Sequence, residues 1–85
     1  MQSINELISV ASVILDNGFD LQAFLSWKQT SFRALRTHLG SEHYYTENFK
    51  RMAEPNEHGL LAGGGILLAA KELLHSSDGS FKNRN

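Results

Sequence analysis

Residues 59–74 of this 85-residue chain have the sequence GLLAGGGILLAAKELL, which is apolar on nearly every side and carries three consecutive glycines. A helix of this composition has no wet face of its own, so it must be surrounded by other elements. Each glycine lowers helix stability by about 1 kcal/mol relative to alanine but permits close approach of a neighbouring backbone. The segment therefore predicts a closely packed helix, with Gly59, Gly63, Gly64 and Gly65 as its close-packing positions.

Length and composition limit the class of protein. A chain of 85 residues makes one domain, and folding at this size buries only about 60 to 65 % of the surface of the unfolded chain, so help from a partner is expected. The absence of cysteine excludes disulfides and thiolate zinc sites and favours a cytoplasmic location. Eight Lys and Arg against nine Asp and Glu give a net charge of −1, without the overall positive charge typical of nucleic-acid-binding proteins.

The sequence shows neither a signal peptide nor a membrane span. No basic stretch precedes an apolar run at the N-terminus. The longest run of apolar or glycine residues, 59–70, is well short of the roughly 20 residues that cross a bilayer. We therefore expect a soluble protein without a membrane partner.

The first half of the chain predicts two helices. A capping box formed by Ser3 and Glu6 starts the first helix, whose apolar residues recur at helical spacing until the stop signal at residues 17–18. Asp20 is the expected N-cap of a second helix that Gly40 ends. The inward-facing residues of this second helix are predicted to be Leu21, Phe24, Leu25, Phe32, Leu35 and Leu39.

The second half predicts a shorter helix and the long apolar one. Ser41 is the expected N-cap of a helix over residues 42–53, and Pro55 closes it. The last helix is expected to begin at residue 56 or 57 and to continue to about His75.

The domain organisation follows from these helices. Residues 76–85 are polar and rich in helix breakers, so they are expected to form a flexible tail or linker. No segment shows the two-residue alternation of a half-buried strand. The predicted fold is all-α, a compact bundle of four helices over residues 1–75.

No residue pattern indicates a catalytic or metal site. The run Gly63–Gly65 lacks the Lys-Ser/Thr of a phosphate-binding P-loop, and the chain has no Gly-x-Ser-x-Gly elbow. Glu42, Glu47 or Glu57 would have to complete any metal site, and no histidine pair has metal-binding spacing on one helix face. Roles at helix ends explain the histidines better; these are His38, His43, His58 and His75. We expect no enzymatic activity, no cofactor and no metal.

Residues 31–51 support an alternative hypothesis, a helix-turn-helix protein that binds DNA or regulates transcription. A helix, a tight turn at Gly40 and a second helix have the outline of that motif. Three glutamates share the second helix, and a solvated face of mixed charge is the commoner cause of such a pattern. The side chains that would contact phosphates and base edges are Tyr44, Thr46, Asn48, Lys50 and Arg51.

Part of the sequence resembles a known family. Trp27, the helix end 35–40 (LRTHLG), the segment 41–49 (SEHYYTENF) and the segment 62–72 (AGGGILLAAKE) are similar to a small helical domain of bacterial antiviral and abortive-infection proteins. There it accompanies effector domains, including some with nucleotide-sensing or TIR-type partners. The resemblance covers about residues 20–74 and implies an accessory module without catalytic residues. Because no effector is attached here, it implies either an excerpt from a longer protein or a stand-alone adaptor.

These observations predict a protein-interaction or oligomerisation module. A small bundle with more apolar surface than it can bury would dock helix faces against another copy or an effector domain. Val10 and Val13 widen the apolar face of the first helix beyond its main stripe, so this helix is the expected contact surface. The predicted interface residues are Ile4, Leu7, Val10, Val13, Ile14 and Trp27.

Overall fold

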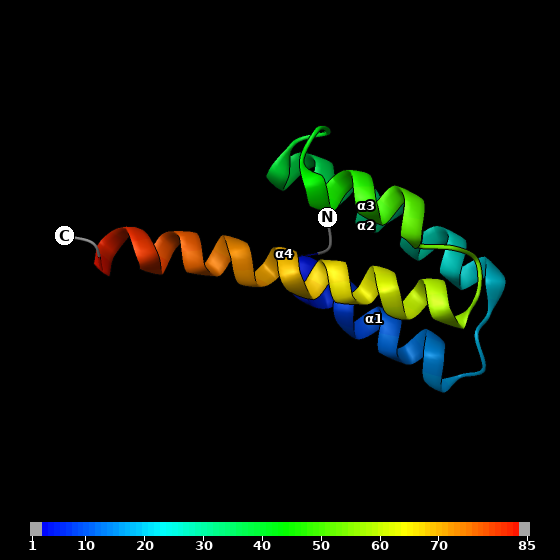
Figure 1. Cartoon of the computed structure of the whole chain (residues 1–85). Coiled ribbons are helices and arrows are strands. Elements are labelled where there is room, and N and C mark those ends of the chain that lie inside the picture. Colours follow the sequence, from blue (N-terminus) through cyan, green and yellow to red (C-terminus); the bar gives the residue numbers. More distant parts are fainter. Residues whose placement is uncertain (1–2, 84–85) are drawn as a thin grey trace.

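A computed structural model describes the backbone of residues 3–83 and the side chains of residues 3–75. Within the described range the chain forms four α-helices and no strand (Figure 1). The all-α, four-helix fold predicted from the sequence is confirmed. The helices are α1 (Ile4–Asp16), α2 (Leu21–Leu39), α3 (Tyr44–Met52) and α4 (Glu57–Asn83).

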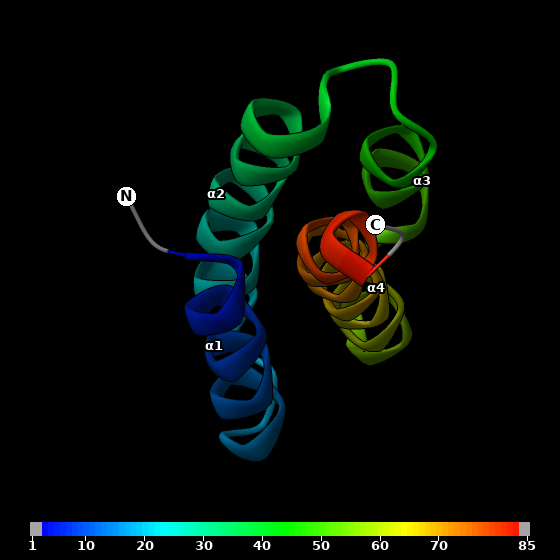
Figure 2. The ribbon, with the colours of Figure 1, turned by 90° about the vertical axis from the view of Figure 1, so that its left-hand side faces the viewer.

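Each helix runs back in roughly the opposite direction to the one before it (Figures 1 and 2). Seen from the end, α1 and α2 lie on one side of the molecule and α3 and α4 on the other (Figure 2). The α4 helix packs beside all three other helices, whereas α1 and α3 are not neighbours in the bundle. The C-terminal part of α4 extends past the other helices, so the molecule measures 47 × 24 × 23 Å (Figure 1).

The core is centred on Trp27 of α2. Its indole Nε1 donates a buried hydrogen bond of 2.7 Å to the backbone carbonyl of Leu7 in α1. Its ring centroid lies 5.7 Å from that of Phe24 and 5.6 Å from that of Phe49 in α3. A Cβ atom at Gly63 of α4 would lie 2.9 Å from Phe49 Cε1 and 3.0 Å from Trp27 Cη2. Trp27 therefore joins α1, α2 and α3, and a glycine lets α4 close over it.

Local capping chemistry sets the helix ends that the sequence predicts correctly. The amide of Glu6 donates to Ser3 Oγ (3.1 Å), and the amide of Ser3 donates to Glu6 Oε1 (2.9 Å), as in a capping box. The amide of Gln22 donates to Asp20 Oδ1 over 3.0 Å at the start of α2. Gly40 ends α2 with φ of 98°, a backbone conformation that favours glycine.

Two helix ends differ from the prediction. The N-cap of α3 is His43 and not Ser41, because the His43 amide donates to the Gly40 carbonyl (3.3 Å) and so places Ser41 inside a turn. The α4 helix continues past His75 to Asn83. An existing helix is extended at little cost, and no proline interrupts this segment. The flexibility predicted for residues 76–85 stays a prediction, and residues 84–85 lie outside the described part of the chain.

The buried face of α2 also differs from the predicted one. Leu21 and Leu25 were expected to point inward, but they are 49 % and 47 % exposed. Phe32 and Leu39 are half-buried. Because Trp27 reaches α1 and Phe49, the helix turns the Trp27 side to the core and leaves a second apolar row at the surface. The buried residues of α2 are Phe24, Trp27, Ser31, Ala34 and Leu35.

Candidate docking surfaces

An open apolar groove of about 210 Å³ lies between α1 and α4. Its rim on α4 is formed by Leu61 and Leu68, which are 57 % and 47 % exposed. The α1 side includes the half-buried Ile8 and Leu15. Ser12 is the one polar side chain among the lining residues, and none of them is charged. We call this surface the α1/α4 groove; it is suited to apolar side chains.

The glycines of α4 fall into two groups. A Cβ atom at Gly59 would overlap the backbone of residue 54, and one at Gly63 would press on the aromatic core. At Gly64 the nearest atom would be at the ordinary contact distance of 3.8 Å, and at Gly65 nothing lies within 4 Å. Gly64 and Gly65 line the α1/α4 groove. The close-packing prediction thus describes the surroundings of Gly59 and Gly63, whereas Gly65 faces open space.

The residues predicted as an interface divide between core and surface. Ile4, Leu7, Ile14 and Trp27 are 6 %, 0 %, 4 % and 3 % exposed. These four are core residues: their own fold encloses them, so a partner of the folded chain has no access to them. Val13 is 56 % exposed and Val10 is half-buried. Of the six predicted interface residues, only these two leave apolar surface available.

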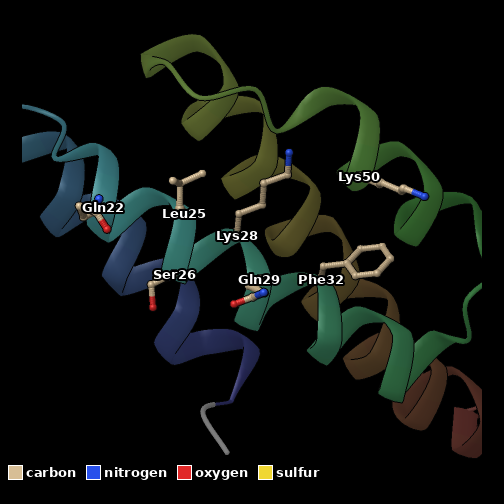
Figure 3. A pocket seen from close by; sticks show the side chains of 7 residues that line it. All are labelled: Gln22, Leu25, Ser26, Lys28, Gln29, Phe32 and Lys50. Carbon is tan, nitrogen blue, oxygen red and sulfur yellow. The ribbon is translucent and has the colours of Figure 1, made fainter.

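A second hollow, of about 470 Å³, lies between α2 and α3 (Figure 3). Its apolar side chains are Leu25 and Phe32, and its charged ones are Lys28 of α2 and Lys50 of α3. The Arg36 guanidinium lies 5.8 Å from the centroid of the Phe32 ring, in cation–π range. No carboxylate lines this hollow, which we call the basic groove; its other lining residues are Gln22, Ser26 and Gln29.

The arrangement of α2 and α3 does not favour the helix-turn-helix hypothesis. In that motif the two helices cross at a steep angle, whereas α3 runs back beside α2 (Figures 1 and 2). Of the five candidate contact residues on α3, Thr46 is 0 % and Asn48 6 % exposed. Asn48 Oδ1 also accepts a hydrogen bond from Arg51. Two of the side chains proposed to contact base edges therefore face the interior.

Three of the four histidines lie at or near helix ends, whereas His75 lies eight residues before the end of α4. His43 Nδ1 accepts a 3.0 Å hydrogen bond from the Tyr45 amide as the N-cap of α3. His38, His58 and His75 are exposed. Within the part of the chain that the structure describes, no three His, Cys, Asp or Glu side chains are grouped closely enough to hold a metal ion. The helices of that same part include none that combines the length and the apolar character needed to cross a bilayer.

Two buried hydroxyl groups were not anticipated from the sequence. Ser31 Oγ and Thr46 Oγ1 are fully buried and have no hydrogen-bond partner. Neither residue lines the α1/α4 groove or the basic groove. These two hydroxyl groups affect the stability of the fold, because a buried polar group without a hydrogen-bond partner lowers the free energy of unfolding.

Comparison of the chain with protein-family models, with curated proteins and with solved structures finds no match. The functional inference therefore depends on the chemistry of the two grooves.

Proposed function

We propose that this chain is a protein-interaction module that docks an apolar helix of a partner protein in the α1/α4 groove. The observation that carries the proposal is the uncharged lining of this groove, with Leu61 and Leu68 half-exposed on its rim. Full burial of a leucine side chain contributes about 1.5–3 kcal/mol. Covering two half-exposed leucines is therefore a sizeable driving force for association.

Gly65 provides a second argument. A glycine inside a helix lowers its stability by about 1 kcal/mol relative to alanine, and nothing within 4 Å of Gly65 requires one there. The neighbouring Gly64 is similarly unconstrained. A partner helix that crosses α4 at this pair would come close to its backbone, as at other small-residue contacts between helices.

A protein partner fits this groove better than nucleic acid. Binding to nucleic acid depends mainly on Lys and Arg contacts to phosphates, and the α1/α4 groove has no charged lining residue. The resemblance of residues 20–74 to accessory domains supports a finer assignment, in which the partner is an effector domain of a bacterial antiviral defence protein. In that role the chain contributes docking and no catalysis.

Site-specific photocrosslinking in the source cells tests the proposal. A photoreactive amino acid at position 68 is expected to crosslink to an apolar helical segment of one protein, identified by mass spectrometry of the joined peptides. The same group at Leu73, which is exposed on α4 but does not line the groove, is the matched control. In a Gly65→Leu background the added side chain fills the groove, so the crosslink at position 68 should be lost. Equal crosslinking to many proteins at positions 68 and 73 would contradict the proposal.

A further inference from the structure

The outward face of α1 combines two carboxylates with two valines. Glu6, Val10, Val13 and Asp16 follow one another at intervals of four, three and three residues, so they share one side of the helix. This side lies opposite the buried row that includes Ile4. Val13 is 56 % exposed, Val10 is half-buried, and both acidic residues are exposed. We call these four residues the α1 face; it is apolar in the middle and acidic at both ends.

One of the two carboxylates stabilises α1, and the other does not. Glu6 lies in the first turn and accepts a 2.9 Å hydrogen bond from the Ser3 amide. Asp16 is the last residue of the helix, at the negative end of its dipole, where a carboxylate is unfavourable. The last turn of α1 contains no basic residue to offset it. An external cation is therefore the favourable partner for Asp16.

The basic groove has the opposite character. Leu25 is 47 % exposed and lines the same hollow as the half-buried Phe32, two turns further along α2. Lys28 and Lys50 come from the two helices that border the hollow (Figure 3). Arg36 lies against the Phe32 ring. The net charge of the whole chain is −1, so positive charge here is a local property. The groove is thus an apolar surface bordered by cations.

The α1 face and the basic groove also have the same length. Glu6 and Asp16 are ten residues apart on α1, and Gln22 and Phe32, both in the lining of the groove, are ten residues apart on α2. At the rise of an α-helix each interval is about 15 Å long. Val13 and Asp16 are three residues apart on α1, as Leu25 and Lys28 are on α2, so a helix lying along α2 can place Val13 against Leu25 while Asp16 lies near Lys28.

We propose that the α1 face of one copy of this chain docks in the basic groove of a second copy. The two surfaces differ, so the contact is heterologous, and each copy in the assembly has one α1 face and one groove to offer. Opposite charges favour the encounter and set the register, while burial of valine, leucine and phenylalanine holds the copies together. This association is independent of the α1/α4 groove, which shares no residue with either surface.

The test is sedimentation analysis of the full chain over a range of micromolar concentrations. At a salt concentration of about 50 mM the average mass is expected to rise with protein concentration, and the rise should weaken at about 500 mM because salt screens the charged contacts. Val13→Asp blocks the α1 face and Leu25→Asp blocks the groove, each at an exposed side chain. Each variant alone should be monomeric, with at least a tenfold weaker association and unchanged helical circular dichroism. Leu73→Asp is the control: Leu73 is exposed but belongs to neither surface, so this variant should associate as the parent does.

Mixing the two variants gives the decisive result. The intact α1 face of the Leu25→Asp chain can enter the intact groove of the Val13→Asp chain, so an equimolar mixture should form a species of two chains and nothing larger. A parent chain that stays monomeric at every concentration, or a mixture that stays monomeric while the parent associates, overturns the proposal. Leu61→Asp separates the two functions: it should leave this self-association unchanged and abolish the photocrosslink at position 68.

Discussion

Gly63 and Gly65 are two positions apart on α4 and have opposite surroundings. A Cβ atom at Gly63 would come within 3.0 Å of both Trp27 and Phe49, whereas nothing lies within 4 Å of Gly65. The first glycine is required by the packing of this chain, and the second is required by no contact within it. One run of glycines therefore serves two sides of the helix, and only its inward side is explained by the fold.

The largest expected loss of stability comes from the aromatic core that Gly63 faces. Trp27→Ala removes the side chain that joins α1, α2 and α3 and leaves the Leu7 carbonyl without the indole hydrogen bond. A buried tryptophan replaced by alanine lowers the free energy of unfolding by about 3–5 kcal/mol. Urea denaturation followed by circular dichroism measures this loss. Leu25→Ala on the same helix is the matched control, because Leu25 is 47 % exposed and its loss should cost less than about 1 kcal/mol.

The next effect concerns Gly63 itself. Gly63→Ala is expected to lower the free energy of unfolding by about 1–3 kcal/mol, since overpacking exceeds the gain in helix propensity. The nearest tryptophan atom is Cη2, which phenylalanine lacks. The same substitution in a Trp27→Phe background should therefore be less harmful, and this coupling appears in a double-mutant cycle. Equal losses in both backgrounds would show that the Trp27 contact does not restrict position 63.

Gly65→Ala should change the free energy of unfolding in the opposite direction from Gly63→Ala. The added methyl group meets no atom within 4 Å, so the gain in helix propensity raises the free energy of unfolding by about 0.5–1 kcal/mol. Thermal unfolding measures the change. If a partner helix docks at Gly64–Gly65, the same variant should crosslink less efficiently from position 68 although it is more stable. A destabilised Gly65→Ala chain would remove the distinction between the two glycines.

The sequence predicts the parts of this fold that short-range chemistry decides. The capping box at Ser3–Glu6, the Asp20 cap and the Gly40 stop each depend on residues within four positions of one another. The helix class and the number of helices follow from these signals and from apolar spacing. The N-cap at His43 was missed because a hydrogen bond across the preceding turn, and not residue preference, decides where α3 begins.

The candidate surfaces were harder to predict, because they depend on which side of each helix faces the core. The α2 helix has two apolar rows, one through Trp27 and one through Leu21 and Leu25, and spacing alone does not choose between them. The long-range bond from Trp27 to the Leu7 carbonyl accompanies burial of the first row and exposure of the second. The same orientation buries most of the predicted interface on α1 and leaves Val13 outside.

The smallest expected effect on stability comes from removing a polar group from the core while keeping the shape of the side chain. Thr46 Oγ1 is fully buried without a hydrogen-bond partner, and valine has nearly the same shape without the hydroxyl group. Removing an unpaired buried hydroxyl relieves a desolvation penalty, so Thr46→Val should raise the free energy of unfolding by about 0.5 kcal/mol. Thr37→Val, at an exposed position of α2 where water can bind the hydroxyl, should change it by less. A loss of stability in Thr46→Val alone would mean that this hydroxyl has a partner in solution, and the inward side would then be held by polar contacts as well as by the packing around Gly63.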